Sequence, residues 1–160
     1  MADSYQFPVD RTQVMLFARA LLDIRPEYWD PDDPATKAIG GIVTPPTFVI
    51  SSAHWDPDYP LDLTRPRKEP RQPRQEGEGR GGNVARILHA EQHFEYHHPI
   101  RVGDVLTVTS RPGKTWEKQG RRGGRLLFTE TITEFRNQDG VLCVTARSVG
   151  VQTEKAVEQS

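Results

Sequence analysis

A run of alternating histidines and glutamates in the middle of the chain carries residue types that bind metal ions. His89, Glu91, His93, Glu95 and His97 are spaced two apart, so on a β-strand all five side chains would lie on one face. Three imidazoles and two carboxylates could bind zinc. The string His-Ala-Glu-Gln-His lacks the order of the metalloprotease motif His-Glu-x-x-His. We favour a polar strand face near a dimer interface or pocket mouth, and expect no metal.

A second group with possible chemistry is Asp23, which is followed by Arg25 and Tyr28. A carboxylate can act as a general acid or base, but just past a helix it can also be solvated or paired with an arginine. A phenol, whose ordinary pKa is about 10, is a poor general base at neutral pH, although it can orient water or donate a proton. The residue types alone leave both a catalytic and a structural role open for Asp23.

The composition excludes several other kinds of site. Cys143 is the only cysteine, so an intrachain disulfide or a cysteine metal cluster is impossible, and we expect the reducing cytoplasm. A net charge of −1 gives no general case for binding nucleic acid or an anionic membrane. No apolar run approaches the roughly 20 residues needed to span a bilayer, and a signal-peptide core is not evident.

Two helices are predicted before the middle of the chain. Asp10 can cap the first, with Gln13 placed for a capping box and Val9 and Val14 for a hydrophobic staple. Its apolar side chains recur with helical spacing and form one stripe, which comprises Val14, Phe17, Ala18, Leu21 and Leu22. A second, buried helix should begin near Thr44, because a threonine cap followed by proline is a start signal.

Residues 56–83 form a predicted insertion that is rich in Pro, Arg, Gly and Glu and offers little apolar surface to bury. Within residues 65–86 seven Lys/Arg and three Asp/Glu give a local charge of +4. A basic loop of this kind could attract the phosphates of coenzyme A or of a phosphopantetheine carrier, and it could equally be a solvated, flexible insertion. It has no aromatic residue for base stacking, so nucleic-acid binding ranks last.

The rest of the chain reads as successive strands. We predict them at residues 87–97, 105–116, 126–135 and 141–151, the second long and bulged at Pro112–Gly113. Asn137 to Gly140 has the composition of a hairpin turn. Consecutive hairpins form an antiparallel sheet, so helices followed by a meander indicate a single α+β domain over residues 1–160.

Several segments in this order resemble the MaoC-like dehydratases, especially the N-terminal half of the double-hot-dog members. They are Phe7 to Val9, Leu22 to Trp29, Thr44 to Phe48, Leu88 to Gln92, Phe94 to Asp104, Glu117 to Gly124, Glu134 to Gly140 and Ala146 to Ser148. The resemblance implies the hot-dog fold, in which a long antiparallel sheet wraps around a buried central helix. It also implies reversible hydration of a 2-enoyl thioester, with neither a metal nor a redox cofactor.

The same resemblance assigns roles to individual residues. Asp23 matches the catalytic carboxylate of the family pattern Asp-x-Asn-Pro-x-His, whereas Arg25 replaces the Asn and Tyr28 replaces the His. The segment that contains Thr44, Thr47 and Phe48 matches the start of the central helix, where backbone N–H groups bind the thioester carbonyl. Pro45 and Pro46 each lack such a donor.

These departures suggest how the chain could act. We expect a homodimer, or a heterodimer with a second MaoC-like subunit that supplies the missing Asp and His, and an acyl-CoA or acyl-carrier-protein thioester as substrate. A purely acyl-binding or structural subunit is the alternative. His89 or His93 could also reach a site across a dimer interface. Thioesterases of this fold need a carboxylate on the central helix, and residues 44–54 contain none.

Overall fold

The computed structural model describes residues 4–57, 59, 87–120 and 124–153. The predicted insertion at 56–83 and the predicted turn at 120–124 therefore lie largely outside the described residues. The described chain divides into two compact units. The first unit contains residues 4–57, 59, 94–111 and 133–146, and the second contains residues 87–93, 112–120, 124–132 and 147–153.

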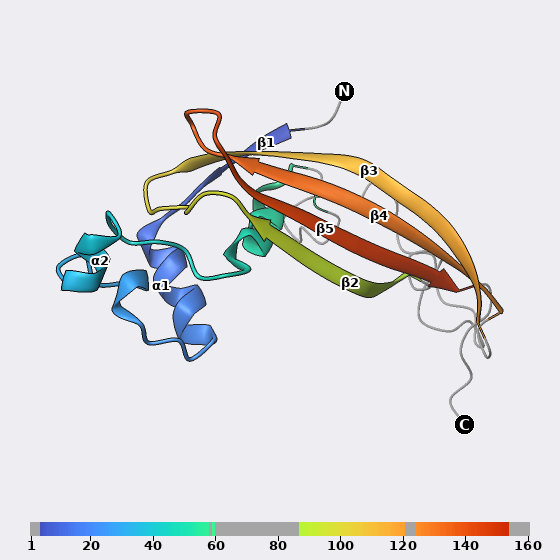
Figure 1. The fold of residues 1–160 in the computed structure, drawn as a ribbon, viewed down its shortest axis with the longest axis horizontal. Coiled ribbons are helices and arrows are strands. Elements are labelled where there is room, and N and C mark those ends of the chain that lie inside the picture. Colours follow the sequence, from blue (N-terminus) through green and yellow to red (C-terminus); the bar gives the residue numbers. More distant parts are fainter. Residues whose placement is uncertain (1–3, 58, 60–86, 121–123, 154–160) are drawn as a thin grey trace, which may run out of the picture. The chain divides into compact units, whose positions relative to one another are not determined.

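The four predicted strands are present in a five-stranded sheet (Figure 1), but they do not form one continuous meander, because the first of them lies beside the last and not beside the second. Its strands are β1 (Ser4–Pro8), β2 (Ile87–Tyr96), β3 (Val105–Gly120), β4 (Gly124–Arg136) and β5 (Leu142–Thr153), in the order β1-β3-β4-β5-β2. Strand β1 was not predicted from the sequence. It pairs antiparallel with β3, from Ser4 opposite Thr109 to Pro8 opposite Val105. Strand β3 continues through Pro112 and Gly113, as predicted.

The predicted hairpin turn between β4 and β5 is confirmed in detail. The Asn137 side-chain oxygen accepts hydrogen bonds from the backbone N–H groups of Asp139 and Val141, and Gly140 has the positive φ of +77° that such a turn requires. An asparagine that bonds its own loop and a glycine that accepts a left-handed conformation thus determine where β4 ends and β5 begins.

The first helix, α1 (Arg11–Ala20), begins as predicted but ends earlier. The Asp10 carboxylate accepts from the N–H groups of Thr12 and Gln13, while Gln13 Oε1 is buried without a partner, so only half of the capping box forms. Val14 and Ala18 are buried. The apolar stripe was extended too far, because Leu21 lies beyond the last helical residue and is 56% exposed.

The predicted helix start at Thr44 is wrong. A 3₁₀ helix, η2 (Phe48–Trp55), begins four residues later. Pro46 explains the delay, since a residue that precedes proline is disfavoured in the α conformation, and here that residue is Pro45. Helix η2 is also only partly buried: Phe48 and Val49 are in the core, but Ile50 is 55% exposed.

Two short helices precede η2: η1 (Pro26–Tyr28) and α2 (Pro34–Ala38). The sequence analysis did not predict either of them. The Asp33 side chain caps α2 by accepting from the N–H of Ala35, and Pro34 occupies the first helical position.

The main hydrophobic core lies in the first unit and is built around Phe48. Its ring stacks on Phe7 of β1 at 5.6 Å between centroids and meets Phe17 of α1 edge-on at 5.4 Å. The Tyr5 hydroxyl also lies 3.2 Å from the Ser52 hydroxyl. Helix η2 is therefore held against β1 and α1 by aromatic packing and one polar contact.

The second unit contains a buried carboxylate in an ion pair, which was not predicted from the sequence. Glu130 on β4 is 5% exposed, and its carboxylate accepts from the Lys114 main-chain N–H at 3.2 Å and from Arg147 Nη1 at 3.0 Å. These two donors hold the pKa of Glu130 below its ordinary value, the main-chain N–H contributing most. Gly113 leaves room for the side chain, because a Cβ there would lie 2.3 Å from Glu130 Oε1.

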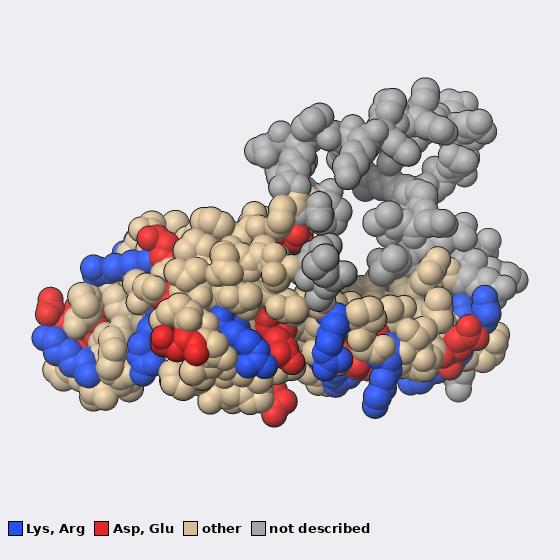
Figure 2. Space-filling view, turned by 90° about the horizontal axis from the view of Figure 1, so that it is seen from above, with Lys and Arg blue, Asp and Glu red and all other residues tan. Residues whose placement is uncertain are grey.

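Charge is spread rather than concentrated on the surface that can be seen in Figure 2. Lys and Arg side chains are interspersed there with Asp and Glu, and no extended area of a single sign is visible among the described residues. No helix in the described part of the chain is both long and apolar enough to cross a membrane.

Candidate functional site

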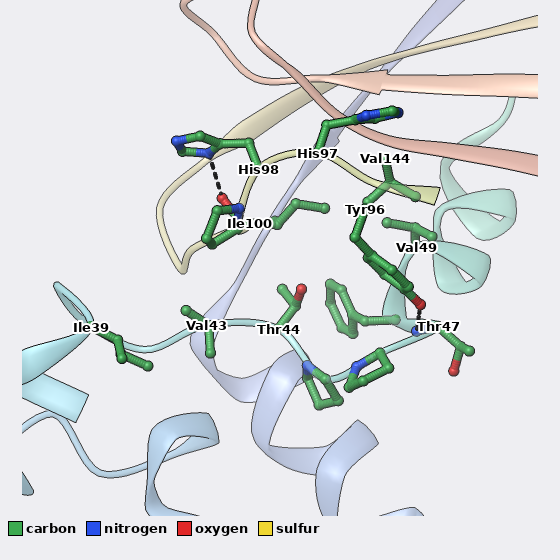
Figure 3. Close-up of a pocket in the computed structure, with 14 residues that line it drawn as sticks. Ile39, Val43, Thr44, Thr47, Val49, Tyr96, His97, His98, Ile100 and Val144 are labelled. Carbon is green, nitrogen blue, oxygen red and sulfur yellow. Dashed lines mark hydrogen bonds between the residues drawn. The ribbon is translucent and has the colours of Figure 1, made fainter. Parts of the chain in front are cut away.

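The first unit contains a cavity of about 450 Å³ with predominantly apolar walls (Figure 3). One wall is the cavity segment, which we define as residues 43–49, together with Ile39, and the other comes from residues 96–100 and Val144. A cavity of this volume is in the range that binds small molecules. Thr44, Thr47 and Phe48, the predicted binding residues, all line it.

Main-chain pairing holds the two walls of the cavity together. The Thr44 N–H donates to the Ile100 carbonyl oxygen at 3.0 Å, and the Val102 N–H donates to the Ile42 carbonyl oxygen at 3.0 Å. Val43 and Arg101 form the antiparallel bridge between these bonds. The cavity therefore depends on backbone hydrogen bonds between segments 56 to 60 residues apart in the sequence rather than on a single loop.

The backbone donors of the cavity segment are almost all used by the chain itself. Val43 N–H donates to the Glu27 carbonyl oxygen, Thr44 N–H is bound as above, and Phe48 N–H donates to the Pro45 carbonyl oxygen at 3.2 Å. The two prolines have no N–H. Thr47 N–H instead donates to the hydroxyl of a side chain, Tyr96, at 3.2 Å.

Tyr96 is a site residue that the sequence analysis did not identify. Figure 3 shows its ring pointing toward Thr47, and the residue is 55% exposed. Tyr96 ends β2, whose alternation was analysed for histidines and glutamates on the opposite face. No local sequence pattern marks it, because its contact with Thr47 joins residues 49 positions apart.

The two histidines beside the cavity do not direct their rings into it. His97 Nε2 lies 3.0 Å from the Thr145 hydroxyl, and His98 Nδ1 lies 2.9 Å from the Pro99 carbonyl oxygen. In Figure 3 both rings point away from Thr44 and Thr47. Neither imidazole is placed here as a base for a ligand in the cavity.

The predicted catalytic residues lie in the motif segment, which we define as residues 22–28. Leu22 N–H donates to the Arg19 carbonyl oxygen and Asp23 N–H donates to the Ala18 carbonyl oxygen, the Schellman arrangement that ends a helix. Leu22 occupies the left-handed position, with φ of +57°, where glycine is usual. Asp23 is thus fixed relative to the end of α1 by main-chain hydrogen bonds.

Within the motif segment Arg25 binds both predicted catalytic side chains. Its Nε lies 3.0 Å from Asp23 Oδ1 and its Nη2 lies 2.8 Å from Asp23 Oδ2, while Nη2 also donates to the Tyr28 hydroxyl. The guanidinium carbon lies 4.8 Å from the centre of the Tyr28 ring, a cation–π distance. Asp23 is therefore in a paired state within the chain.

The pKa values of the two side chains move in opposite directions. Hydrogen bonds from Arg25 lower the pKa of Asp23, whereas burial raises the pKa of Tyr28, with Arg25 partly offsetting the rise. A general base works best when its pKa is near the working pH. Asp23 becomes a weaker base, and Tyr28 stays a protonated phenol at neutral pH.

The motif segment and the cavity segment are neighbours, but they form different environments. Neither Asp23 nor Tyr28 is among the residues that line the cavity. One main-chain hydrogen bond joins the two segments, from the Val43 N–H to the Glu27 carbonyl oxygen at 3.0 Å. The structure thus brings Thr44, Thr47 and Phe48 together at a cavity, whereas Asp23 and Tyr28 do not line it.

Exposure does not divide the alternating run around β2 into two faces, because Leu88, Ala90 and Tyr96 are exposed as well. His89, Glu91, His93, Glu95 and His97 are all exposed, and His93 Nε2 lies 3.0 Å from Glu91 Oε2. Among the described residues, no cluster of three or more His, Cys, Asp or Glu side chains has a geometry that could hold a metal ion.

The chain is similar in sequence to a dehydratase domain family and to several bacterial proteins. The sequence model of the FAS1-like dehydratase domain region matches residues 2–146. A UPF0336 protein of Streptomyces avermitilis is 35% identical over 113 residues, which span 65% of this chain and 60% of that protein. A UPF0336 protein of Parafrankia sp. is 33% identical over 138 residues, covering 85% of this chain and 78% of that protein.

Solved structures with the same fold include dehydratases and hydratases. The HadBC (3R-hydroxyacyl-ACP dehydratase) complex from Mycobacterium tuberculosis aligns with a TM-score of 0.65 at 22% identity, over 94% of this chain and 95% of that one. The ChsH1–ChsH2 complex from the same organism gives 0.68 at 17% identity, over 99% and 86%. The (R)-hydratase from A. caviae gives 0.62 at 19%, over 96% and 94%. The fold is therefore the predicted hot-dog fold.

Proposed function

Because the chain belongs to the FAS1-like dehydratase domain family, we propose that it is an acyl-thioester-binding subunit of a 3-hydroxyacyl-thioester dehydratase or enoyl hydratase. In this proposal residues 1–160 act as one hot-dog domain that holds the acyl group, and a second MaoC-like subunit supplies the intact Asp and His. The substrate is an acyl-CoA or acyl-carrier-protein thioester, as predicted from the sequence.

The observation that carries the proposal is an apolar cavity in a chain whose predicted catalytic carboxylate, Asp23, is paired with its own Arg25. An acyl chain requires apolar walls, which Val43, Phe48, Ile100 and Val144 provide. Hydration requires a base that takes a proton from water, yet Asp23 is bound at both oxygens by Arg25. This combination supports binding in this chain and proton transfer in a partner.

Exposed apolar side chains beside the motif segment support a partner subunit. Leu22 is 86% exposed and Ile24 is 84% exposed, and Leu21 next to them is 56% exposed. Neighbouring exposed apolar side chains commonly mark protein–protein contacts. The solved structures of HadBC and of ChsH1–ChsH2 are complexes of two different chains, which makes a second MaoC-like subunit the partner that we propose for this surface.

A non-catalytic subunit is the alternative function, and one observation favours it. Asp23 and Tyr28 do not line the cavity, which fits a purely structural chain that stabilises its partner without contacting the substrate. The two functions differ in whether the partner needs this chain for turnover or only for solubility.

The test is hydration of trans-2-octenoyl-CoA, followed by loss of the enoyl absorbance, for the chain alone and for the chain co-expressed with a MaoC-like protein that carries an intact Asp-x-Asn-Pro-x-His motif. We expect activity only in the pair. Activity should persist in Asp23→Asn of this chain and be lost when the partner's motif is inactivated. Full activity of the single chain that Asp23→Asn abolishes would overturn the need for a partner.

A matched variant separates the two candidate functions. Val144→Trp fills the cavity from a wall that does not belong to the motif segment, and Val141→Trp places the same side chain at a nearby position that is 42% exposed and does not line the cavity. If the chain holds the acyl group, only Val144→Trp should raise the KM of the pair. Equal KM values for both variants would favour the purely structural role.

A further inference from the structure

The Thr47 N–H differs from its neighbours in the kind of group that accepts its hydrogen bond. Val43, Thr44 and Phe48 donate to main-chain carbonyl oxygens, which cannot leave without unfolding the local backbone. Thr47 donates to a phenolic hydroxyl at the end of a side chain. A side chain can leave by rotating about its own bonds. Thr47 N–H is therefore the donor that a ligand can reach without disrupting the fold.

Tyr96 has the surroundings of a side chain that can move. It is 55% exposed and lines the cavity. Its hydroxyl contacts Thr47, and its ring lies 6.2 Å from the ring of Phe94 with 26° between the planes. The ring is thus half exposed beside Phe94, and a neutral hydrogen bond holds its hydroxyl at the cavity segment.

We propose that Tyr96 is a displaceable substitute for the carbonyl oxygen of the acyl ligand. In the empty cavity its hydroxyl occupies the Thr47 N–H. When an acyl pantetheine thioester enters, the carbonyl oxygen takes over that N–H and Tyr96 rotates away, while the aliphatic chain packs against Val43, Phe48 and Ile100. This inference rests on the proposed acyl-binding function and adds to it the donor, the competing side chain and the order of events.

Because Pro45 and Pro46 have no N–H, competition between Tyr96 and a ligand for the Thr47 N–H affects the affinity for the ligand. Pro45 and Pro46 leave Thr47 as the first residue of the turn into η2 that can donate to a ligand. Every ligand carbonyl that seeks this donor must compete with Tyr96. The competition lowers the affinity for ligands with a carbonyl group and leaves the affinity for purely aliphatic groups unchanged, so Tyr96 is a positioning residue that sets affinity.

The test combines Tyr96→Phe with a pair of probes that differ in one oxygen atom. S-octanoyl-pantetheine carries the carbonyl, and S-octyl-pantetheine, a thioether, lacks it. Affinities come from calorimetry, and the exchange rate of the Thr47 amide comes from NMR on ¹⁵N-labelled protein. Tyr5→Phe is the matched control, because it removes a hydroxyl that contacts Ser52 of η2 and does not line the cavity.

We expect Tyr96→Phe to bind S-octanoyl-pantetheine about three- to tenfold more tightly than the wild type, the range for removing one competing neutral hydrogen bond. Its affinity for the thioether should not change. In the free protein the Thr47 amide should exchange several-fold faster in Tyr96→Phe and not in Tyr5→Phe. Adding S-octanoyl-pantetheine should slow that exchange again. Octanoyl-CoA and an octanoyl carrier protein, run as further arms, identify the source of the thioester.

Two results would overturn the inference in distinguishable ways. If S-octanoyl-pantetheine binds in the cavity but Tyr96→Phe binds it equally or more weakly, Tyr96 does not compete for Thr47, while the proposed acyl-binding function stands. If the thioester binds neither the wild type nor Tyr96→Phe, both the exchange and acyl binding by this chain are refuted.

Discussion

The motif segment and the cavity segment share one backbone feature and differ in nearly everything else. Leu22 in the first and Thr47 in the second are the non-glycine residues with positive φ among those that the structure describes. The side chains that follow Leu22 are exposed or hydrogen-bonded to Arg25. Thr47, in contrast, directly precedes Phe48 of the aromatic core. Under the proposed function, this difference means that one chain keeps the binding segment without the proton-transfer groups.

The largest difference between the two segments should appear in stability. Phe48→Ala removes a ring that is 1% exposed and packs on two other rings, and it should lower the free energy of unfolding by about 3–5 kcal/mol. Ile24→Ala in the motif segment, at 84% exposure, should change it by less than about 0.5 kcal/mol. Urea denaturation measures both. Similar losses would show that the Ile24 side chain contributes to the core.

The rate of hydration by the single chain should rise when the motif segment is changed to the family pattern Asp-x-Asn-Pro-x-His. In Arg25→Asn/Tyr28→His the carboxylate is freed and an imidazole replaces the phenol. Under the proposed function the single chain should then hydrate trans-2-octenoyl-CoA at least about 100-fold faster than the wild type, since a positioned general base contributes roughly 10²–10⁴.

Arg25→Asn/Tyr28→Phe is the control for that experiment, because it frees Asp23 without supplying a base. Circular dichroism establishes whether both double variants fold. A folded Tyr28→His variant that shows no gain would mean that Asp23 does not reach the acyl group, and the alternative, non-catalytic role would then be favoured.

Substituting glycine at the two positions with positive φ should change the free energy of unfolding by up to about 1 kcal/mol in either segment but change ligand affinity in only one. Leu22→Gly and Thr47→Gly each relieve an unfavourable φ, and each should raise the free energy of unfolding by up to about 1 kcal/mol, less the added entropy of the unfolded chain. Only Thr47→Gly should also alter ligand affinity. Thermal melts with and without S-octanoyl-pantetheine measure both effects, and a shift in ligand affinity caused by Leu22→Gly would contradict the separation.

The smallest effect concerns the charge on Asp23. Its pKa is lower in the folded chain than in the unfolded one because of Arg25, so its contribution to stability is present above the unfolded value, about 3.9, and is lost as the pH falls through the folded value. Carboxyl ¹³C NMR should show the pKa of Asp23 rising in Arg25→Gln. Lys37→Gln, which affects the exposed pair with Asp32, should leave it unchanged.

Similar start signals in two places show what the sequence could predict. Asp33–Pro34 and Thr44–Pro45 both combine a capping residue with proline at the next position, and only the first pair starts a helix. The second fails because Pro46 follows. The positions of the later strands, the Asn137 turn and the Asp10 cap followed from local patterns, which is why they were predictable, whereas the place of β2 beside β5 was not.

Other features depended on tertiary contacts that local patterns do not contain. The Leu21 to Asp23 helix end needs a left-handed leucine where glycine is usual. The Asp23–Arg25 pair was recognised as one of two alternatives, but the sequence could not decide between them. Tyr96 became visible only when β2 and the cavity segment were seen to meet, because the contact joins residues 49 positions apart.

The hydrogen bond from Val43 N–H to the Glu27 carbonyl oxygen has a thermodynamic consequence for a paired enzyme. It makes the backbone beside the exposed Leu22 and Ile24 continuous with the wall that would contact an acyl chain. If subunit association shifts that wall, the two events are linked: the factor by which the partner changes ligand affinity must equal the factor by which the ligand changes the dimerisation constant. A single titration of assembly against acyl concentration would measure that reciprocity.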